Sequence, residues 1–367
     1  MPIKIYFRRR KQIFFTPGPA ELYFTVEGHI KKALTEQVPS ISHRSARFQS
    51  IFQEAEENLR NLLSLPNNYY IFFTGSATEI WERIIQNLVA ERSYHYVNGS
   101  FSNRFYKIAE ELGRSPVIQK AEEGSCAVVD PEKIPSDIEL VAFTQNETST
   151  GAAQPLDDIY QVRQSHPEAI IAVDAVSTLP YIPLDYTQVD TAYFSVQKGF
   201  GLPAGLGVWL VNDRCLAKAE QLAQQQSIGS YHSLPSLLEK ARKHQTPETP
   251  NVLGIYLLAK VVSDMLGKGI DVIRNETKFK AGMMYQTLSE HDNFTPFVKK
   301  AEHQSRTVIV TETRKPAQEI IQKLQESGLF LGSGYGHFKD KHVRIANFPT
   351  HSREQFIQLI DKMNAIL

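Results

Sequence analysis

The sequence predicts an α/β protein: a large domain built on an open, mostly parallel sheet, followed by a smaller α+β domain. Short apolar runs alternate with helical patterns through the middle of the 367-residue chain, and this alternation is typical of parallel strands joined by helical crossovers. The pattern after about residue 250 differs, because long amphipathic helices come first and isolated strands follow. Polar residues recur just past the apolar runs, where open α/β sheets bind ligands.

The large domain begins with a long helix expected at 48–63. Apolar runs then predict strands at 69–73, 95–97, 140–143, 170–173, 191–196 and 207–211. Helical spacing predicts helices between them at 78–90, 101–112 and 156–164. The residues at or just past the predicted strand ends are Thr74, Asn98, Thr144, Asp174 and Lys198. We expect these residues to share one edge of the sheet.

The C-terminal part is expected to form the smaller domain. Helices are predicted at 252–266, 272–288, 316–327 and 354–366, and strands at 307–311 and 343–346. Residues 246–250, TPETP, indicate an ordered loop just before them. We therefore expect a large domain over 21–255, a small domain over 256–367, and an N-terminal segment, 1–20, that packs with the small domain.

Composition argues against several classes of partner. Lys plus Arg and Asp plus Glu are balanced at 40 each, so nothing favours nucleic acid or a membrane surface. No apolar stretch reaches the roughly 18 residues of a membrane span. The two cysteines, Cys126 and Cys215, form neither a disulfide framework nor a zinc-binding pattern. We expect a cytoplasmic protein with no metal site.

Lys198 carries the main chemical hypothesis. It follows the predicted strand 191–196 and precedes a glycine-rich run, GFGLPAGLG, which lets backbone approach a bulky ligand. Asp174 ends the buried run 169–173. Pyridoxal 5′-phosphate needs such a pair, because an amine bonds to its aldehyde and a carboxylate keeps its ring nitrogen protonated. A solvated surface lysine is the alternative that Lys198 alone leaves open.

Several neighbouring segments fit the same cofactor, each with a structural alternative. Ser76 lies at a strand-to-helix turn, where helix-start amides suit a phosphate, although it also fits a helix cap with Glu79. Phe101 follows a strand end and a glycine; it could stack on a ring or lie in the core. Thr148, in the polar run QNETSTG, could donate to a ring hydroxyl oxygen or simply form part of a loop.

Three further residues could bind an anionic substrate. His43 and Arg44 lie together before the helix expected at 48–63, and Arg344 lies within an apolar strand. Arginine suits carboxylates and phosphates because its guanidinium can donate two parallel hydrogen bonds. A surface role for His43 and Arg44, and a structural ion pair for Arg344, are the alternatives.

Together these segments resemble the phosphoserine aminotransferase family within the class V, fold-type I aminotransferases, over nearly the whole chain. The similar segments are FFTPGPAEL at 14–22, ISHRSARF at 41–48, the block at 52–79, QKGFGLPAGLG at 197–207 and TPETPNVLGIY at 246–256. The resemblance implies a mostly parallel seven-stranded sheet, pyridoxal 5′-phosphate as cofactor, amino-acid and 2-oxo-acid substrates, and a homodimer whose subunits share their active sites.

The resemblance also implies roles for individual residues. Lys198 would form the imine with the cofactor, and Asp174 would bind its ring nitrogen. The remaining cofactor contacts would come from Gln197 and Thr148 at the ring hydroxyl, from Ser76, Ala77 and Thr78 at the phosphate, and from Thr249 of the neighbouring subunit. Arg344 would take the substrate carboxylate, with His43 and Arg44 also on the substrate side.

Two positions depart from the family pattern. Phe101 stands where the family usually has a stacking tryptophan, and it can still stack. His337 and Phe338 stand where the family has a His-Arg pair for the substrate phosphate, and a phenylalanine cannot bind phosphate. Lys339, Lys341 or His342 could supply the missing charge.

Three hypotheses remain open. The first is transfer of the amino group of glutamate to 3-phosphohydroxypyruvate, which yields phosphoserine and 2-oxoglutarate in serine biosynthesis. The second is a class V aminotransferase that uses unphosphorylated serine or alanine with glyoxylate or pyruvate. The third is a non-catalytic protein that keeps the cofactor-binding fold. A cysteine desulfurase is disfavoured, because neither Cys126 nor Cys215 lies in the C-terminal domain.

Overall fold

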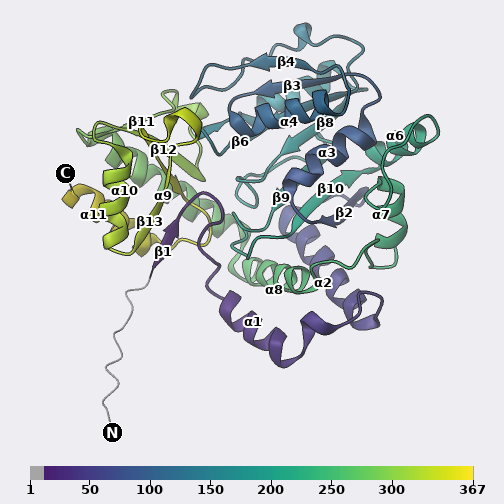
Figure 1. Cartoon of the computed structure of the whole chain (residues 1–367), viewed down its shortest axis with the longest axis horizontal. Helices are drawn as coiled ribbons and strands as arrows, with labels where there is room; N and C mark the ends of the chain where they lie inside the picture. Colours follow the sequence, from purple (N-terminus) through teal and green to yellow (C-terminus); the bar gives the residue numbers. More distant parts are fainter. Residues whose placement is uncertain (1–11, 367) are drawn as a thin grey trace.

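The computed structural model describes residues 12–366, and its largest element is a seven-stranded sheet (Figure 1). In spatial order the strands are β2 (Tyr69–Thr74), β10 (Gly207–Asn212), β9 (Thr191–Ser195), β8 (Ile170–Asp174), β5 (Leu140–Thr144), β3 (Ser93–Val97) and β4 (Val117–Lys120). Only β10 runs antiparallel to its neighbours. The predicted seven-stranded, mostly parallel α/β sheet is confirmed.

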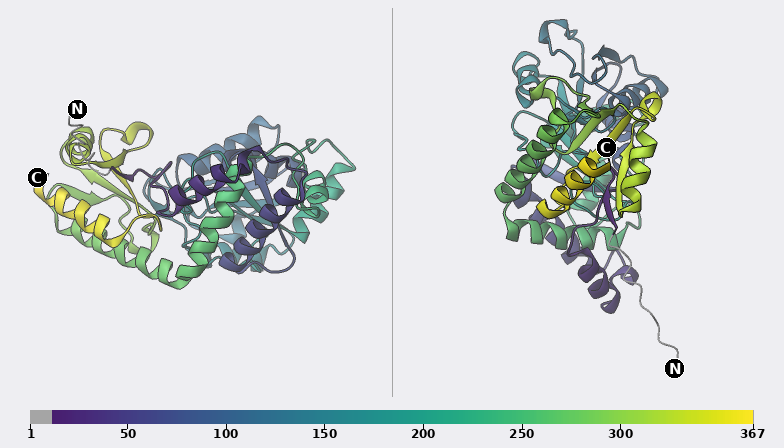
Figure 2. Two further views of the ribbon diagram at one scale, coloured as in Figure 1. Left: turned by 90° about the horizontal axis from the view of Figure 1, so that it is seen from below. Right: turned by 90° about the vertical axis from the view of Figure 1, so that its left-hand side faces the viewer.

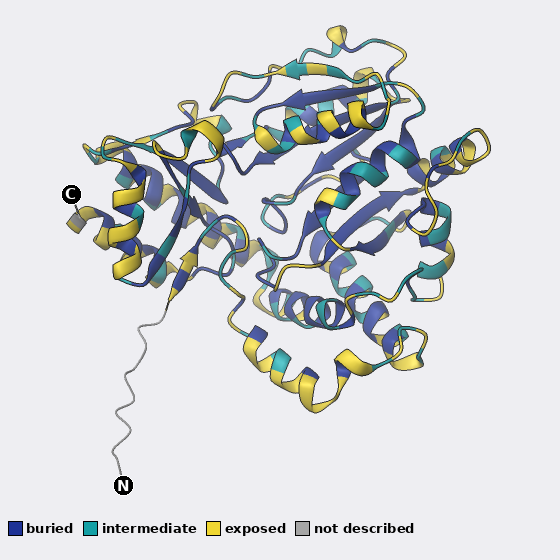
Figure 3. Cartoon of the chain, in the orientation of Figure 1, coloured by how far each residue is buried: buried dark blue, intermediate teal, exposed yellow. Residues whose placement is uncertain are grey.

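Helices cover both faces of this sheet, because successive strand residues point to opposite sides. Val208 and Leu210 pack into one core, whereas Trp209 between them packs into the other. The first core also receives α2 (Ala46–Leu63), α5 (Leu156–Ser165) and α8 (Val252–Lys268). The second receives α3 (Ala77–Leu88), α4 (Ser100–Glu111), α6 (Asp213–Ala223) and α7 (Leu234–Ala241). In Figure 3 the central strands of this sheet are buried, the edge strand β4 is half-buried to exposed, and the outer helix faces are exposed.

A second sheet lies to one side of the first, and its central strands are antiparallel. Its order is β1 (Ile13–Phe15), β13 (Leu329–Ser333), β14 (His342–Ala346), β12 (Val308–Thr313) and β11 (Phe294–Pro296). The N-terminal strand β1 pairs in parallel with β13, more than 300 residues away. The helices α9 (Ile270–Glu290), α10 (Ala317–Glu326) and α11 (Arg353–Ile366) contribute to the core of this region. Residues 1–11 of the expected N-terminal segment lie outside the described part.

Two consecutive helices connect the sheets, as the left view of Figure 2 shows. The helix α8 packs along α2, and α9 continues toward the second sheet. Gly269 between them has φ of +90°, a conformation that favours glycine, and it allows the chain to change direction there. A short helix, α1 (Val26–Thr35), also packs on α8. None of the helices within 12–366 is both long and apolar enough to cross a bilayer.

Candidate active site

A cavity of about 210 Å³ opens at the ends of β2, β5, β8 and β9, the edge that the sequence predicted. Thr144 ends β5 and Asp174 ends β8, and both line the cavity. Seven of the predicted cofactor residues line it: Ala77, Thr78, Phe101, Thr148, Asp174, Gln197 and Lys198. Gly18, Pro19, Trp81, Asn146, Val176 and Ser195 line it as well and were not predicted.

The Lys198 side chain is buried, with 8% of the residue exposed. Its Nζ donates to the carbonyl oxygen of Pro17 at 2.9 Å and lies 3.5 Å from the hydroxyl of Thr148. Burial lowers the pKa of this amine from 10.5 to about 8, because the charged form loses its hydration. A larger fraction of this amine is therefore neutral and nucleophilic near physiological pH than for an ordinary lysine.

The Asp174 carboxylate is held at the end of β8 by two donors. Trp81 donates from its indole nitrogen at 3.0 Å, and the amide of Val176 donates at 2.9 Å. Burial nevertheless raises the pKa of Asp174 from 3.8 to about 7, although these two hydrogen bonds act in the opposite direction. A buried carboxylate of this kind favours a cationic partner such as a protonated ring nitrogen.

The turn between β2 and α3 leads to the cavity, which Ala77 and Thr78 line and the predicted Ser76 does not. Ser76 caps α3, since its hydroxyl accepts from the amide of Glu79 at 3.2 Å. The expected capping box is incomplete, because Glu79 accepts from the amide of Gly75 instead. Gly207 on β10 allows this turn to approach the sheet: a Cβ there would lie 2.5 Å from Ser76 backbone. The start of α3, at Ala77 and Thr78, thus faces the cavity with its positive dipole end.

Glu147 holds the Phe101 segment in place and was not predicted. This carboxylate is fully buried and accepts from the amides of Phe101, Ser102 and Ser149 at 3.0–3.3 Å. Gly99 is required beside it, because a Cβ would come within 2.3 Å of Glu147. Phe101, at the start of α4, has its ring centroid 5.7 Å from Lys198 Nζ. Glu147 therefore fixes the position of an aromatic ring next to the Lys198 amine.

Arg344 approaches the same region from β14 of the second sheet. Its Nε donates to the carbonyl oxygen of Ser333 at 2.7 Å, and one terminal nitrogen donates to that of Thr148 at 3.3 Å. The guanidinium lies over the ring of Tyr335, 5.4 Å from the centroid. Burial lowers the pKa of Arg344. Both of these hydrogen bonds use neutral acceptors, so the positive charge remains available to an anionic ligand.

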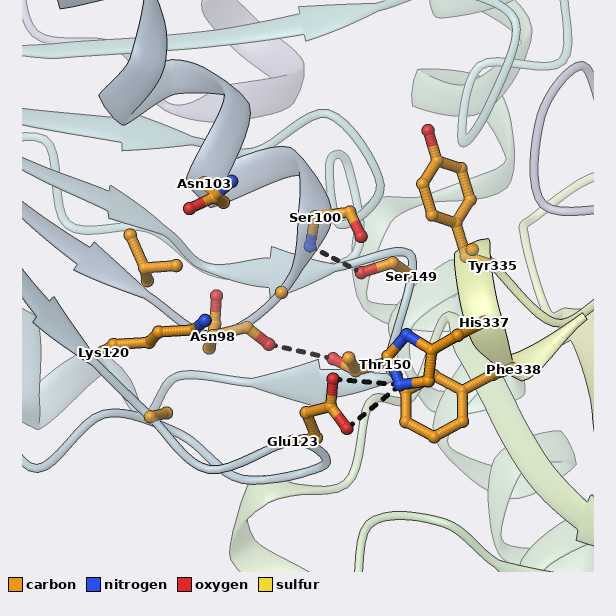
Figure 4. Close-up of a pocket in the computed structure, with 14 residues that line it drawn as sticks. Asn98, Ser100, Asn103, Lys120, Glu123, Ser149, Thr150, Tyr335, His337 and Phe338 are labelled. Atoms are coloured by element: carbon orange, nitrogen blue, oxygen red, sulfur yellow. Dashed lines mark hydrogen bonds and ion pairs between the residues drawn. The ribbon is translucent and has the colours of Figure 1, made fainter. Parts of the chain in front are cut away.

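His337 and Phe338 line a second cavity, of about 160 Å³ (Figure 4). Its lining residues Ser100 and Ser149 directly adjoin Phe101 and Thr148 of the first cavity in the sequence. Tyr335 lies at its edge and contacts Phe101 at 5.3 Å between ring centroids. The imidazole of His337 points to Glu123, with its Nε2 3.2 Å from one carboxylate oxygen. Phe338 stacks on His342 at 4.3 Å. Lys120 and Asn98 also line this cavity.

His43, Arg44 and Thr249 do not line the Lys198 cavity of their own chain. His43 and Arg44 lie just before α2. Arg44 donates to the carbonyl oxygens of Thr246 and Pro247 at 2.8 and 3.1 Å. Thr249 is exposed in the 246–250 loop. The structure thus brings Arg44 together with this loop, and keeps both apart from Lys198.

Pyridoxal 5′-phosphate fits the chemistry of this cavity. Its aldehyde needs an amine, its ring nitrogen a carboxylate and its phosphate the free amides of a helix start. Lys198, Asp174 and the start of α3 supply these three groups around one cavity. The positions of Trp81 and Glu147 could not be read from local patterns, because Trp81 has the spacing of a core residue and Glu147 that of a loop residue.

Known proteins are similar to this chain over most of its length. The model of the family described as aminotransferase class-V matches residues 14–343. A phosphoserine aminotransferase structure from Cytophaga hutchinsonii is similar with 48% identity and a TM-score of 0.94, covering 97% of this chain and 99% of that one. A putative phosphoserine aminotransferase of Mycobacterium avium is 31% identical over 84% of this chain and 82% of its own length.

More distant structures share the fold alone. An aspartate aminotransferase from Thermus thermophilus covers 97% of this chain and 100% of its own, with a TM-score of 0.85 and 23% identity. The fold-type I architecture expected from the sequence is therefore confirmed, and so is the resemblance to the phosphoserine aminotransferases.

Proposed function

Because this chain belongs to the class-V aminotransferase family, whose members use pyridoxal 5′-phosphate, we propose that it exchanges an amino group between phosphoserine and 2-oxoglutarate. In the biosynthetic direction, glutamate and 3-phosphohydroxypyruvate are the substrates. One observation carries the proposal: Lys198 and Asp174, from different strand ends, line the same buried cavity. A non-catalytic protein would have no need to keep both.

The bound cofactor supplies an aldehyde that bonds to amines and a protonated ring that accepts an electron pair. Lys198 moves the proton at the substrate Cα, for which its amine must be neutral; the lowered pKa of about 8 supports this role. Asp174 holds the proton at the ring nitrogen. Phe101 covers one ring face, while Gln197 and Thr148 bind the ring hydroxyl side.

Anion binding is divided between the two ends of the site. Ser76, Ala77 and Thr78 bind the cofactor phosphate through the start of α3. Arg344 binds the substrate carboxylate, which its free charge and its position beside Thr148 support.

The residues expected at the substrate phosphate make other contacts in this structure. His337 pairs with Glu123, and Phe338 packs on His342. This observation favours a second candidate, an aminotransferase for unphosphorylated serine or alanine with glyoxylate or pyruvate. The 48% identity to a phosphoserine aminotransferase supports the first candidate.

Steady-state assays decide between the candidates. Purified holoenzyme is given phosphoserine with 2-oxoglutarate, and in parallel serine or alanine with glyoxylate or pyruvate. A kcat/KM at least 100-fold higher for the phosphorylated pair is expected. Preference for serine or alanine would select the second candidate, and absence of turnover with an intact cofactor spectrum would support a binding protein.

We also propose that the protein is a homodimer with shared active sites. The contacts of Arg44 with Thr246 and Pro247 support this arrangement, because they join the substrate-side pair His43 and Arg44 to the Thr249 loop. If this part of the chain reaches a neighbouring subunit, His43, Arg44 and Thr249 all act in the cavity of that subunit. Sedimentation velocity and a T249A variant test this: a monomer with full cofactor affinity would contradict it.

The division of the chain and its location remain proposals too. The expected boundaries are 1–20, 21–255 and 256–367, and the pairing of β1 with β13 supports attaching the first segment to the last. The boundary at 255/256 lies within α8, where Ile255 and Tyr256 are buried, so limited proteolysis should cleave near Gly269, between α8 and α9, before it cleaves within either unit. The cytoplasm is proposed because Cys126 and Cys215 are both free and buried.

A further inference from the structure

His232 lies outside the cavity, yet it connects the cavity to the Thr249 loop. It precedes α7 and has only 3% of its surface exposed. Its Nδ1 contacts a carboxylate oxygen of Glu79 on α3, and its Nε2 lies 3.1 Å from a carboxylate oxygen of Glu248. Glu79 also binds the amide of Gly75 at the turn that faces the cavity, and Glu248 directly precedes Thr249.

Both ring nitrogens of His232 face acceptors. A neutral imidazole has one N–H, so it can donate to only one of the two carboxylates, and its other nitrogen would face an oxygen lone pair. The imidazolium donates to both. The geometry therefore favours a charged histidine, which is stabilised when each of its N–H groups meets an ionised acceptor.

We propose that the His232 imidazolium is a positioning residue, which holds the 246–250 loop against the start of α3 and thereby sets Thr249 for the neighbouring subunit's cofactor phosphate. The inference rests on the proposed shared active site and extends it. His232 touches neither substrate nor cofactor, and it acts through Glu248 and the loop. We call the contacts Glu79–His232–Glu248 the His232 link. This link joins the β2–α3 turn of one subunit, through Thr249, to the cofactor phosphate of the other subunit.

The charge state of His232 makes this link sensitive to pH. Burial by itself lowers the pKa of His232, but the hydrogen bonds to Glu248 and Glu79 raise it from 6.5 to about 9. The groups that face this cluster are Glu79 and Arg83 on α3, Glu248 and nearby His43, and the adjoining Tyr231 ring. The link is therefore complete at neutral pH and is lost as the pH rises through about 9.

Cofactor affinity of the full-length protein tests the proposal. Apoprotein is titrated with pyridoxal 5′-phosphate at pH 7.5 and pH 10, with visible absorbance as the readout. The H232Q variant removes the positive charge, E248Q removes the negative charge of one acceptor, and H166Q is the control at a half-buried histidine elsewhere. At pH 7.5 we expect H232Q and E248Q to bind about tenfold more weakly than wild type, as loss of one hydrogen bond to a charged group predicts.

At pH 10 the affinities of wild type and H232Q should agree within about twofold, because wild-type His232 is then neutral. Titration of Lys198 affects both proteins equally and cancels in this ratio. H166Q should match wild type at both pH values. Wild-type affinity of both H232Q and E248Q at pH 7.5, or an undiminished difference at pH 10, would overturn the proposal.

A double variant separates positioning from general destabilisation. If His232 acts through Thr249, H232Q/T249A should bind no more weakly than T249A alone, because coupled residues are not additive. Additive losses would overturn the route through Thr249. Normal binding by T249A would overturn the shared site itself, whereas a weakened T249A with a normal H232Q would overturn only the role of His232.

Discussion

Replacing Asp174 with asparagine should make the stability of the cofactor-free protein much less dependent on pH. Asp174 is 3% exposed, and burial raises its pKa from 3.8 to about 7. The folded state then binds this proton more tightly than the unfolded state. Its contribution to stability is present below pH 3.8 and is lost as the pH rises through about 7.

The size of the effect follows from the pKa values. Each pKa unit corresponds to about 1.4 kcal/mol. In the folded state Asp174 keeps its proton from pH 5 up to its pKa of about 7, a span of about two pH units, whereas the unfolded chain has already lost it. Between pH 5 and pH 8.5 the ionisation of Asp174 should therefore cost the folded apoprotein about 3 kcal/mol. The side chain of the D174N variant cannot ionise. Its amide keeps only one of the two oxygen acceptors that Trp81 and Val176 use, and the lost hydrogen bond should lower the free energy of unfolding by about 1 kcal/mol.

Urea unfolding at pH 5 and pH 8.5 measures this difference. The free energy of unfolding of wild-type apoprotein should fall by about 3 kcal/mol more than that of D174N between these pH values. The histidines titrate in both proteins, so their contributions cancel. The Lys198 amine differs, because the Asp174 carboxylate raises its pKa in wild type and the neutral amide of D174N does not. Pyridoxal 5′-phosphate should stabilise wild type at pH 8.5 and D174N far less. Identical pH dependence of the two apoproteins would refute the assignment of a raised pKa to Asp174.

Three further variants test the neighbouring groups. Lys198→Ala should abolish both turnover and the visible absorbance of bound cofactor, and absorbance that survives would contradict the covalent role of the amine. Trp81→Phe removes a donor to Asp174, so cofactor affinity should fall about tenfold. Trp209→Phe is the matched control, because it removes an indole hydrogen bond to the neutral hydroxyl of Thr191. This control variant should be less stable but should bind the cofactor with unchanged affinity. Glu147→Gln places an amide N–H against backbone donors, so thermal unfolding should show a loss of about 1–3 kcal/mol together with weaker cofactor binding, and an unchanged variant would exclude a positioning role.

The second sheet shows where local patterns were too weak. The strands β12 and β14 were predicted, because their apolar runs are clear. The prediction omitted β13, LFLGS, since it is short and ends in small residues. It also omitted β4, VIQK, an edge strand of the first sheet that alternates between half-buried and exposed positions. Such strands are stabilised mainly by pairing with neighbours that are distant in the sequence.

Local features of the chain were enough to predict the α/β class, the strand ends and the Lys198–Asp174 pair, because an apolar run and the residues that follow it are adjacent in the sequence. Only the packing of distant segments against one another decides which other side chains support these two residues. Trp81 reaches Asp174 across 93 positions, Glu147 binds the start of α4, and His232 joins Glu79 to Glu248. Each of these is a buried polar group whose partner is brought to it by packing, and no spacing along the chain encodes that partner.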